Sequence, residues 1–226
     1  MDVDAFLLTL RLALTTTLVL LALALPLAWW IASGRDPRRA LVQAIVALPL
    51  VLPPTVIGFY LLIVLGPLTL IGRIFIHLVG HPLAFSFSGL LVGSMLYSLP
   101  FAVQPLVSGF EGIDQATLEA SIGLGVSPAK TFWRVVLPLT RSSLLTAAVL
   151  TFTHTVGEFG VVLMLGGNIP GATRTLSIAL YDQVQDFDYA AANRTALLLL
   201  GVSVAALLMI YLWPSARRGR RGDFVD

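Results

Sequence analysis

Long apolar runs, separated by short polar connections, dominate the pattern of residues along the chain. A helix that crosses the ~30 Å hydrocarbon core of a bilayer needs ~20 mostly apolar residues. Five runs meet this requirement, and each is expected to be a membrane span: 6–31, 41–65, 85–107, 139–165 and 190–213. The pattern therefore predicts an all-α membrane protein in which residues 1–226 form a single transmembrane domain.

The overall composition strengthens this prediction. Hydrophobic residues make up 57% of the chain and charged residues 12%, and the mean hydropathy is +0.91, more apolar surface than a water-soluble domain can cover. The absence of cysteine excludes disulfides and thiolate metal sites. A net charge of +2 is too small to indicate a nucleic-acid partner. Neither a cofactor nor a resident metal is expected.

The distribution of Lys and Arg predicts the orientation of the spans. Five spans place the two ends on opposite sides, and the side richer in these residues is cytoplasmic. One side holds ten and the other four: Arg35, Arg38, Arg39, Lys130, Arg134, Arg141, Arg217, Arg218, Arg220 and Arg221 against Arg11, Arg73, Arg174 and Arg194. The N-terminus is therefore expected outside and the C-terminus inside. The acidic start at Asp2 and Asp4 argues against a cleaved signal peptide.

Prolines interrupt the second and third spans. Proline removes a backbone donor and clashes with the preceding turn, so kinks or breaks are expected in both helices. Such irregular backbone serves either helix packing or the lining of a water-filled pore. Gln104, in the third span, is expected to be a buried amide. The prolines concerned are Pro49, Pro53, Pro54, Pro100 and Pro105.

A polar island at 112–136 interrupts the apolar pattern. It is expected to form two short helices, the first capped by Asp114 and ended by Gly125 in a left-handed conformation, the second opened by Ser127-Pro128. An apolar stripe follows helical spacing on the first helix, formed by Leu118, Ile122 and Val126. The stripe either contacts a protein partner or folds back on the helix bundle.

Several residues of the island carry a family resemblance. Glu119-Ala120-Ser121, Gly125 and Leu137-Pro138 resemble the "EAA" loop of permease subunits of binding-protein-dependent ABC importers, with Ser121 in place of the usual second alanine. The resemblance implies a type I ABC importer permease fold. The island at 112–136 would then be the cytoplasmic coupling helix that contacts an ATPase.

Two further stretches narrow the resemblance. "GEFG" at 157–160 is similar to a motif of molybdate, tungstate and sulfate permeases, and "NIPGATRTL" at 168–176 to the version in molybdate permeases. His154 departs from the family, because many relatives carry arginine there. The resemblance implies molybdate import across a bacterial inner membrane, with tungstate or sulfate as near alternatives.

The resemblance also implies the partners. They are a second copy of the chain, a dimer of cytoplasmic ABC ATPases, a periplasmic molybdate-binding protein and the surrounding lipid. The chain itself is expected not to be an enzyme. Its only lysine lies in 124–131, which lacks the glycines and free N–H groups of a phosphate-binding loop.

The fourth span carries polar residues at helical spacing: Thr151, His154, Thr155 and Glu158. Such a stripe is expected to face the bundle or a cavity, as part of a pore or gate. Glu158 would repel an oxyanion, so it is expected to pair with His154 or with backbone donors near Gly157 and Gly160. A packing role for the pair stays open. So does a proton-coupled secondary transporter using His154 and Glu158, although internal repeats, usual in that class, are not evident.

Two outer connections complete the pattern. A short amphipathic helix is expected within 66–84, and another within 173–185 after a type II turn at Pro170-Gly171. Arg174, with neighbouring threonine hydroxyls, is expected to donate to an oxyanion in transit or to neighbouring helix ends. Asp182 belongs to an outer acidic segment that meets the binding protein or forms a solvated face.

Overall fold

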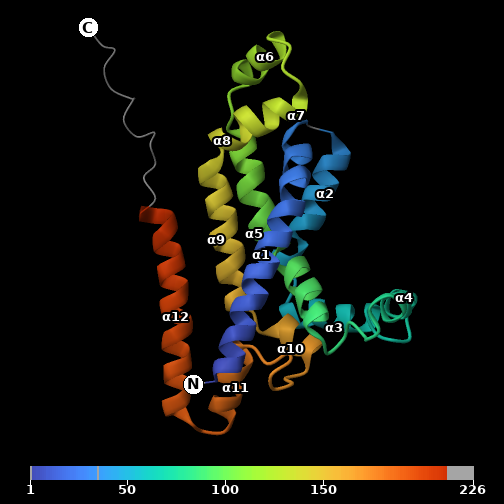
Figure 1. Cartoon of the computed structure of the whole chain (residues 1–226), viewed down its shortest axis with the longest axis vertical. Coiled ribbons are helices and arrows are strands. Elements are labelled where there is room, and N and C mark those ends of the chain that lie inside the picture. Colours follow the sequence, from blue (N-terminus) through green and yellow to red (C-terminus); the bar gives the residue numbers. More distant parts are fainter. Residues whose placement is uncertain (1, 35, 213–226) are drawn as a thin grey trace.

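The computed structural model describes residues 2–34 and 36–212, and all regular secondary structure in this part is helical. Helices α1, α5, α9 and α12 run along the long axis of the molecule (Figure 1). In chain order the elements are α1 (Val3–Ala32), α2 (Pro37–Ala47), η1 (Leu48–Leu50), α3 (Pro54–Val64), α4 (Leu70–Val79), α5 (Phe87–Glu111), α6 (Gln115–Gly123), α7 (Pro128–Thr131), η2 (Phe132–Val136), α8 (Leu137–Leu139), α9 (Arg141–Val156), α10 (Gly160–Gly166), α11 (Leu176–Gln185) and α12 (Tyr189–Leu212).

Three helices in the described part are long and apolar enough to cross a membrane alone: α1, α5 and α12. Two further candidates are bent pairs. Pro37–Leu50 turns by 109° into α3, and Pro128–Leu139 turns by 74° into α9. Counting each pair as one span gives up to five spans in all.

The span expected at 41–65 is broken. The helical segment ends at Leu50, and α3 begins at Pro54 after a turn. Pro53 and Pro54 have no N–H to continue the ladder of hydrogen bonds, and their rings clash with the preceding turn. The break expected from these prolines is thus confirmed.

The span expected at 139–165 is also broken, where a continuous helix was predicted. Helix α9 ends at Val156, and α10 begins only at Gly160. Gly157 and Gly160 each lower helix propensity by about 1 kcal/mol relative to alanine. Glu158 therefore lies in a non-helical connection rather than on the face of α9, and the prediction of one continuous span was wrong.

Helix α5 stays continuous although it contains Pro100 and Pro105. Gln104 on this helix is exposed, so the prediction that its amide is buried was wrong. The reason is helical geometry: the neighbouring positions Ala102, Val103 and Leu106 form the buried face, and Gln104 points away from it.

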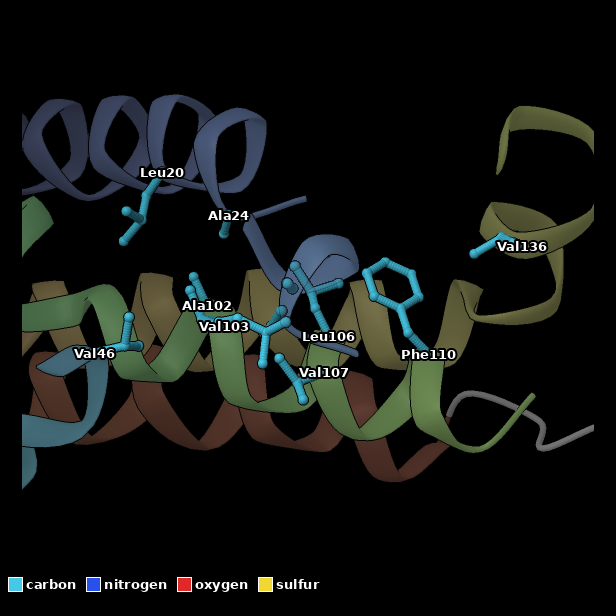
Figure 2. Close-up of a cluster of buried hydrophobic side chains, with 12 residues drawn as sticks. Leu20, Ala24, Val46, Ala102, Val103, Leu106, Val107, Phe110 and Val136 are labelled. Atoms are coloured by element: carbon cyan, nitrogen blue, oxygen red, sulfur yellow. The ribbon is translucent and has the colours of Figure 1, made fainter. Parts of the chain in front are cut away.

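The core lies between α1 and α5 and is closed by α2 and α9. Small residues on α1, including Ala24 and Ala28, let the two long helices approach closely. Leu106 and Phe110 of α5 fill the space beside them (Figure 2). The core continues toward the island, where Val136 is fully buried.

Helix α10 fits tightly between α3 and α5, and glycines make this possible. A Cβ at Gly93 of α5 would lie 2.4 Å from Leu165, and one at Gly58 of α3 would lie 2.7 Å from Met164. A Cβ at Gly160 would lie 3.0 Å from the ring of Pro54. The two broken segments therefore pack directly against each other.

Different short helices lie at the two ends of the molecule. Helices α6 and α7 project at one end, whereas α10 and α11 lie toward the other end, where the N-terminus is, and α4 projects sideways from that half (Figure 1). Helix α4 is the short helix expected in 66–84. The Thr69 hydroxyl caps its start, and Gly80, at φ 83°, ends it. Arg35, residue 213 and the basic segment 216–221 lie outside the described residues.

Candidate coupling surface and gate

The island at 112–136 has the local structure that its sequence predicts. The Asp114 carboxylate accepts a hydrogen bond from the Ala116 N–H at 3.2 Å, at the start of α6. Gly125 has φ 71°, the left-handed conformation that only glycine adopts without strain. Pro128 is the first residue of α7, preceded by Ser127 as its cap. The predictions for Asp114 and Gly125 are confirmed, whereas Ser127 holds the cap position without a capping hydrogen bond from its side chain.

A hydrogen bond between two side chains ties α6 to α7. The hydroxyls of Ser121 and Thr131 are 2.8 Å apart, and both residues are buried. Ser121 is the position at which the motif usually has alanine, so this contact is a feature of this chain. Thr131 was not recognised as a partner from the sequence, because its only signal is a ten-residue separation across the turn.

Ser121→Ala is expected to loosen this connection. The substitution leaves the buried Thr131 hydroxyl without its partner, which costs about 1 kcal/mol. The measurement is the thermal unfolding of the purified protein, compared in a double-mutant cycle with Thr131→Val and the double variant. We expect a coupling of about 1 kcal/mol; strictly additive effects would contradict the contact.

The remaining motif residues lie on the surface or at the base of the island. Glu119 and Ala120 are exposed, and Glu119 has no ion-pair partner within the described chain. Leu137 is half-buried and Pro138 exposed, in the short helix α8 just before the bend into α9. The exposed side of the island thus carries Glu119, and Leu137 joins the island to the bundle.

Only part of the apolar stripe expected on the first helix folds back on the bundle. Leu118 packs against the main core, so this residue folds back on the bundle. Val126 is half-buried, and the side chain of Ile122 is outside the described part. The most exposed apolar residues here are others: Leu124, with 83% of its surface exposed, and Trp133, with 63%. A groove of about 620 Å³ lies beside Leu124, between α6 and α7.

The polar residues of the fourth span take different partners from those predicted. The His154 ring lies 2.9 Å from the Ser98 hydroxyl of α5 and stacks on Phe101 with centroids 4.1 Å apart. The same hydroxyl lies 3.1 Å from that of Thr155. Ser98, which carries no motif, thus joins α5 to α9. The predicted pairing of His154 with Glu158 was wrong, because the helix ends before Glu158 and His154 points to α5.

Glu158 lies buried in the connection between α9 and α10. Only 3% of its surface is exposed, and neither carboxyl oxygen has a hydrogen-bond partner. Its backbone carbonyl accepts a hydrogen bond from the Ser177 hydroxyl. The hydroxyls of Ser94 and Thr151 are likewise buried without partners. The carboxyl group is therefore enclosed by the subunit and does not meet the backbone donors near the glycines that the sequence suggested.

The connection between α10 and α11, residues 167–175, holds Arg174 in a network of its own chain. Its Nε donates to the Asn168 side-chain oxygen at 2.7 Å, and a terminal nitrogen lies 3.5 Å from the Asp182 carboxylate. Asn168 donates to both oxygens of that carboxylate, at 3.1 and 2.9 Å. The Thr173 hydroxyl is buried and donates to the Gly166 carbonyl. Arg174 and Thr173 thus brace the connection between α10 and α11.

The turn within this connection is of the type expected. Gly171 has φ 74°, and the Ala172 N–H donates to the Ile169 carbonyl at 3.2 Å. Positive φ at the third position is the signature of a type II turn. The short helix expected next is α11, which begins at Leu176.

Asp182→Ala is expected to make the connection between α10 and α11 more mobile. The substitution removes an ion pair that is about two-thirds buried, which is worth about 1 kcal/mol. Local opening becomes easier, so trypsin should cleave detergent-solubilised protein after Arg174 about fivefold faster. Asp186→Ala is the control, because Asp186 is exposed and forms no ion pair in the described chain. Equal cleavage of the two variants would contradict the brace.

The fold is that of ABC importer permeases. The inward-facing MetNI methionine ABC transporter is similar with a TM-score of 0.73 at 17% identity, over 93% of each chain. A bacterial alginate ABC transporter, in complex with an alginate-pentasaccharide-bound periplasmic protein, gives 0.68 at 17% identity, over 92% of this chain and 76% of that one. At these identities the likeness shows the fold alone, and it confirms the predicted all-helical type I permease fold.

The sequence places the chain in a family. It belongs to the binding-protein-dependent transport system inner membrane components, whose family model matches residues 24–216. It is 48% identical over 221 residues to the molybdenum transport system permease protein ModB of Azotobacter vinelandii, covering 98% of this chain and 96% of the relative. The same protein of Escherichia coli K12 is 31% identical, over 97% and 96%.

A sulfate relative is also similar. A probable sulfate transport system permease protein of Zygnema circumcarinatum is 36% identical over 188 residues, which cover 83% of this chain and 65% of the relative. The chain is accordingly a multi-pass permease subunit of the inner membrane and has no catalytic role. The ATPase of such an importer is a separate subunit.

Proposed function

We propose that this chain forms the translocation pathway of an ATP-driven molybdate importer. The observation that carries the proposal is its 48% identity to a molybdenum permease, over 98% of this chain and 96% of the relative. The stretch at 168–176, which resembles molybdate permeases, supports it, and the stretch at 157–160 resembles molybdate, tungstate and sulfate permeases alike. Two copies of the chain would assemble with two ATPases and receive molybdate from a periplasmic binding protein, within the lipid of the membrane.

The proposed topology follows from the distribution of basic residues. Five spans, with the bent pairs counted as two of them, place the N-terminus outside and the island at 112–136 in the cytoplasm. The opposite positions of α6 and α4 along the bundle are compatible with this (Figure 1). In this orientation α10 and α11 lie at the outer mouth, where the binding protein would dock.

The island at 112–136 would couple the ATPase to transport. Its exposed face carries Glu119, Ala120 and the apolar tip Leu124, and we assign it to a groove on the ATPase. Ser121 and Gly125 fix the angle between α6 and α7, and Leu137-Pro138 lead to the bend before α9. ATP binding would draw the two ATPases together, and the islands would carry that motion into the bundle.

The gate is assigned to the polar cluster where α9 breaks. Thr151, His154, Thr155 and Glu158 lie in or just after the last turns of α9, and the cluster reaches α5 through Ser98. These groups support the conformational change rather than bind the anion, because Thr151, Thr155 and Glu158 are buried inside the subunit. Arg174 is assigned a bracing role at the outer mouth.

Sulfate is the second candidate substrate, because sulfate permeases are similar at up to 36% identity among the relatives reported above. Tungstate has the same tetrahedral oxyanion chemistry. Molybdate is preferred because the higher identity and the longer coverage belong to the molybdenum permease.

Reconstituted uptake tests the proposal. Proteoliposomes that contain this chain and its ATPase, with the binding protein and labelled molybdate outside, are expected to accumulate molybdate only when ATP is inside. Sulfate and tungstate as competitors rank the substrates. Uptake driven by a proton gradient, without ATPase or binding protein, would instead support a secondary transporter that uses His154 and Glu158.

A further inference from the structure

A second polar surface lies outside the clusters described so far. A groove of about 500 Å³ runs between α2 and α5, on the half of the bundle nearest the island. Its polar residues are two amides, a hydroxyl and a carboxyl group: Gln43, Gln104, Ser108 and Glu111. The other lining residues are small or apolar: Ala40, Ala44, Ala47 and Val107.

The polar groups of α5 form a continuous face. Gln104, Ser108 and Glu111 follow one another at spacings of four and three, so they share one side of the helix. All three are exposed in the isolated subunit, and Gln43 on α2 is exposed opposite them. Yet α5 is apolar enough to cross a membrane. The groove is thus a polar surface within an apolar span.

Such a surface cannot face acyl chains at low cost. Moving an unpaired amide from water into hydrocarbon costs about 4–8 kcal/mol, so exposed amides in a span meet water or protein. The outer face of α12 shows the contrast: its exposed residues include Leu197, Leu200, Val204 and Leu208. The α2–α5 groove therefore faces either water or another protein surface.

We propose that this groove lines the inner half of the anion pathway and that its amides contact the oxyanion. The inference rests on the proposed function and goes beyond it by assigning pathway residues. Gln43 and Gln104 offer neutral N–H donors, and Ser108 offers a hydroxyl. Neutral donors suit a passage, because binding must be favourable enough for entry but weak enough for release.

The charges of the groove fit this role. No lysine or arginine is among its lining residues, so a dianion meets no fixed positive charge that would retain it. Glu111 is the one charged lining residue, and it lies at the end next to α6, where water screens its repulsion of a dianion. Thr151 and Glu158, by contrast, are buried away from any such space and act on the pathway only indirectly.

Cysteine labelling tests whether the groove is hydrated. The chain has no cysteine, so Gln43→Cys, Ser108→Cys and the control Leu208→Cys each carry a single thiol. Leu208 lies on the apolar face of α12, at a comparable distance from its helix end. In the complete transporter, an anionic methanethiosulfonate reagent is expected to modify both groove thiols at least tenfold faster than the control.

The labelling is done without nucleotide and with ATP plus vanadate, so that both inner and outer openings are sampled. Groove thiols as slow as the Leu208→Cys control in both states would overturn the proposal. Pre-incubation with molybdate is expected to slow the modification of Ser108→Cys, which an empty hydrated crevice unrelated to transport would not show.

Substitution of the amide gives an independent test. Gln104→Glu places a carboxylate beside the passing dianion, and molybdate uptake is expected to fall at least tenfold while co-purification of the ATPase is retained. Gln104→Asn keeps the donor and should retain most uptake. Wild-type uptake by Gln104→Glu would overturn the groove inference alone. Absence of molybdate uptake by the wild-type complex would instead overturn the proposed function.

Discussion

Gly125→Pro is expected to abolish ATP-driven uptake, lowering it about 100-fold or to background. Gly125 has φ 71°, whereas proline is fixed near −65°, so the turn between α6 and α7 cannot form in the variant. The exposed face of α6 then no longer meets the ATPase at the native angle. The measurement is uptake in proteoliposomes, together with co-purification of the ATPase and its rate of ATP hydrolysis.

The island also contains the control for this substitution. Gly123 has no positive φ, and a Cβ there would meet nothing within 4 Å. Gly123→Ala should therefore keep uptake near the wild-type level. Glu119→Lys tests the exposed surface of the island separately from its turn, because it reverses an exposed charge without changing the backbone geometry. It is expected to weaken co-purification of the ATPase. Normal uptake by Gly125→Pro would remove the coupling role from the island.

Glu158→Gln is expected to lower uptake about tenfold while assembly stays intact. The amide has the same size as the carboxyl group and costs less to bury. Because neither carboxyl oxygen has a partner here, the group is poorly satisfied in this conformation. A second conformation that supplies hydrogen-bond partners to the carboxyl group is favoured in the wild type. The Glu158→Gln variant would lose this preference, and its transport cycle would slow.

Two measurements separate gating from packing. The unfolding temperature of purified Glu158→Gln is expected to equal or exceed that of the wild type, since the amide is the easier group to bury. Asp186→Asn is the control, because that exposed carboxylate should change neither stability nor uptake. Misfolding or loss of the dimer in Glu158→Gln would show instead that the carboxyl group serves packing.

Local rules predicted the island well. Asp114, Gly125 and Pro128 act through their own backbone or through neighbours two residues away, so capping and turn chemistry located them without knowledge of the fold. The break before α3 was predictable for the same reason, since Pro53 and Pro54 lack donors wherever they are placed. The type II turn at Gly171 belongs to the same class of local features.

Features that depend on distant neighbours were missed. Thr151, Thr155 and Glu158 are four and three residues apart, so the sequence pattern predicted that they share one helix face. Nothing in that pattern revealed that α9 ends at Val156. Ser98 became a partner of His154 only because α5 packs on α9, 56 residues away in the chain. The amide groove depends likewise on which face of α5 the core occupies, so Gln104 was wrongly predicted to be buried.

The close contact of α3 with α10 limits how the subunit can move. A Cβ at Gly160 would crowd Pro54 and a Cβ at Gly58 would crowd Met164, so the two helices approach closely at two points. We therefore expect the two helices to move together, with the turns at residues 51–53 and 157–159 as the flexible points. A rotation at one turn would then be accompanied by a rotation at the other, which reduces the number of independent motions in this part of the subunit.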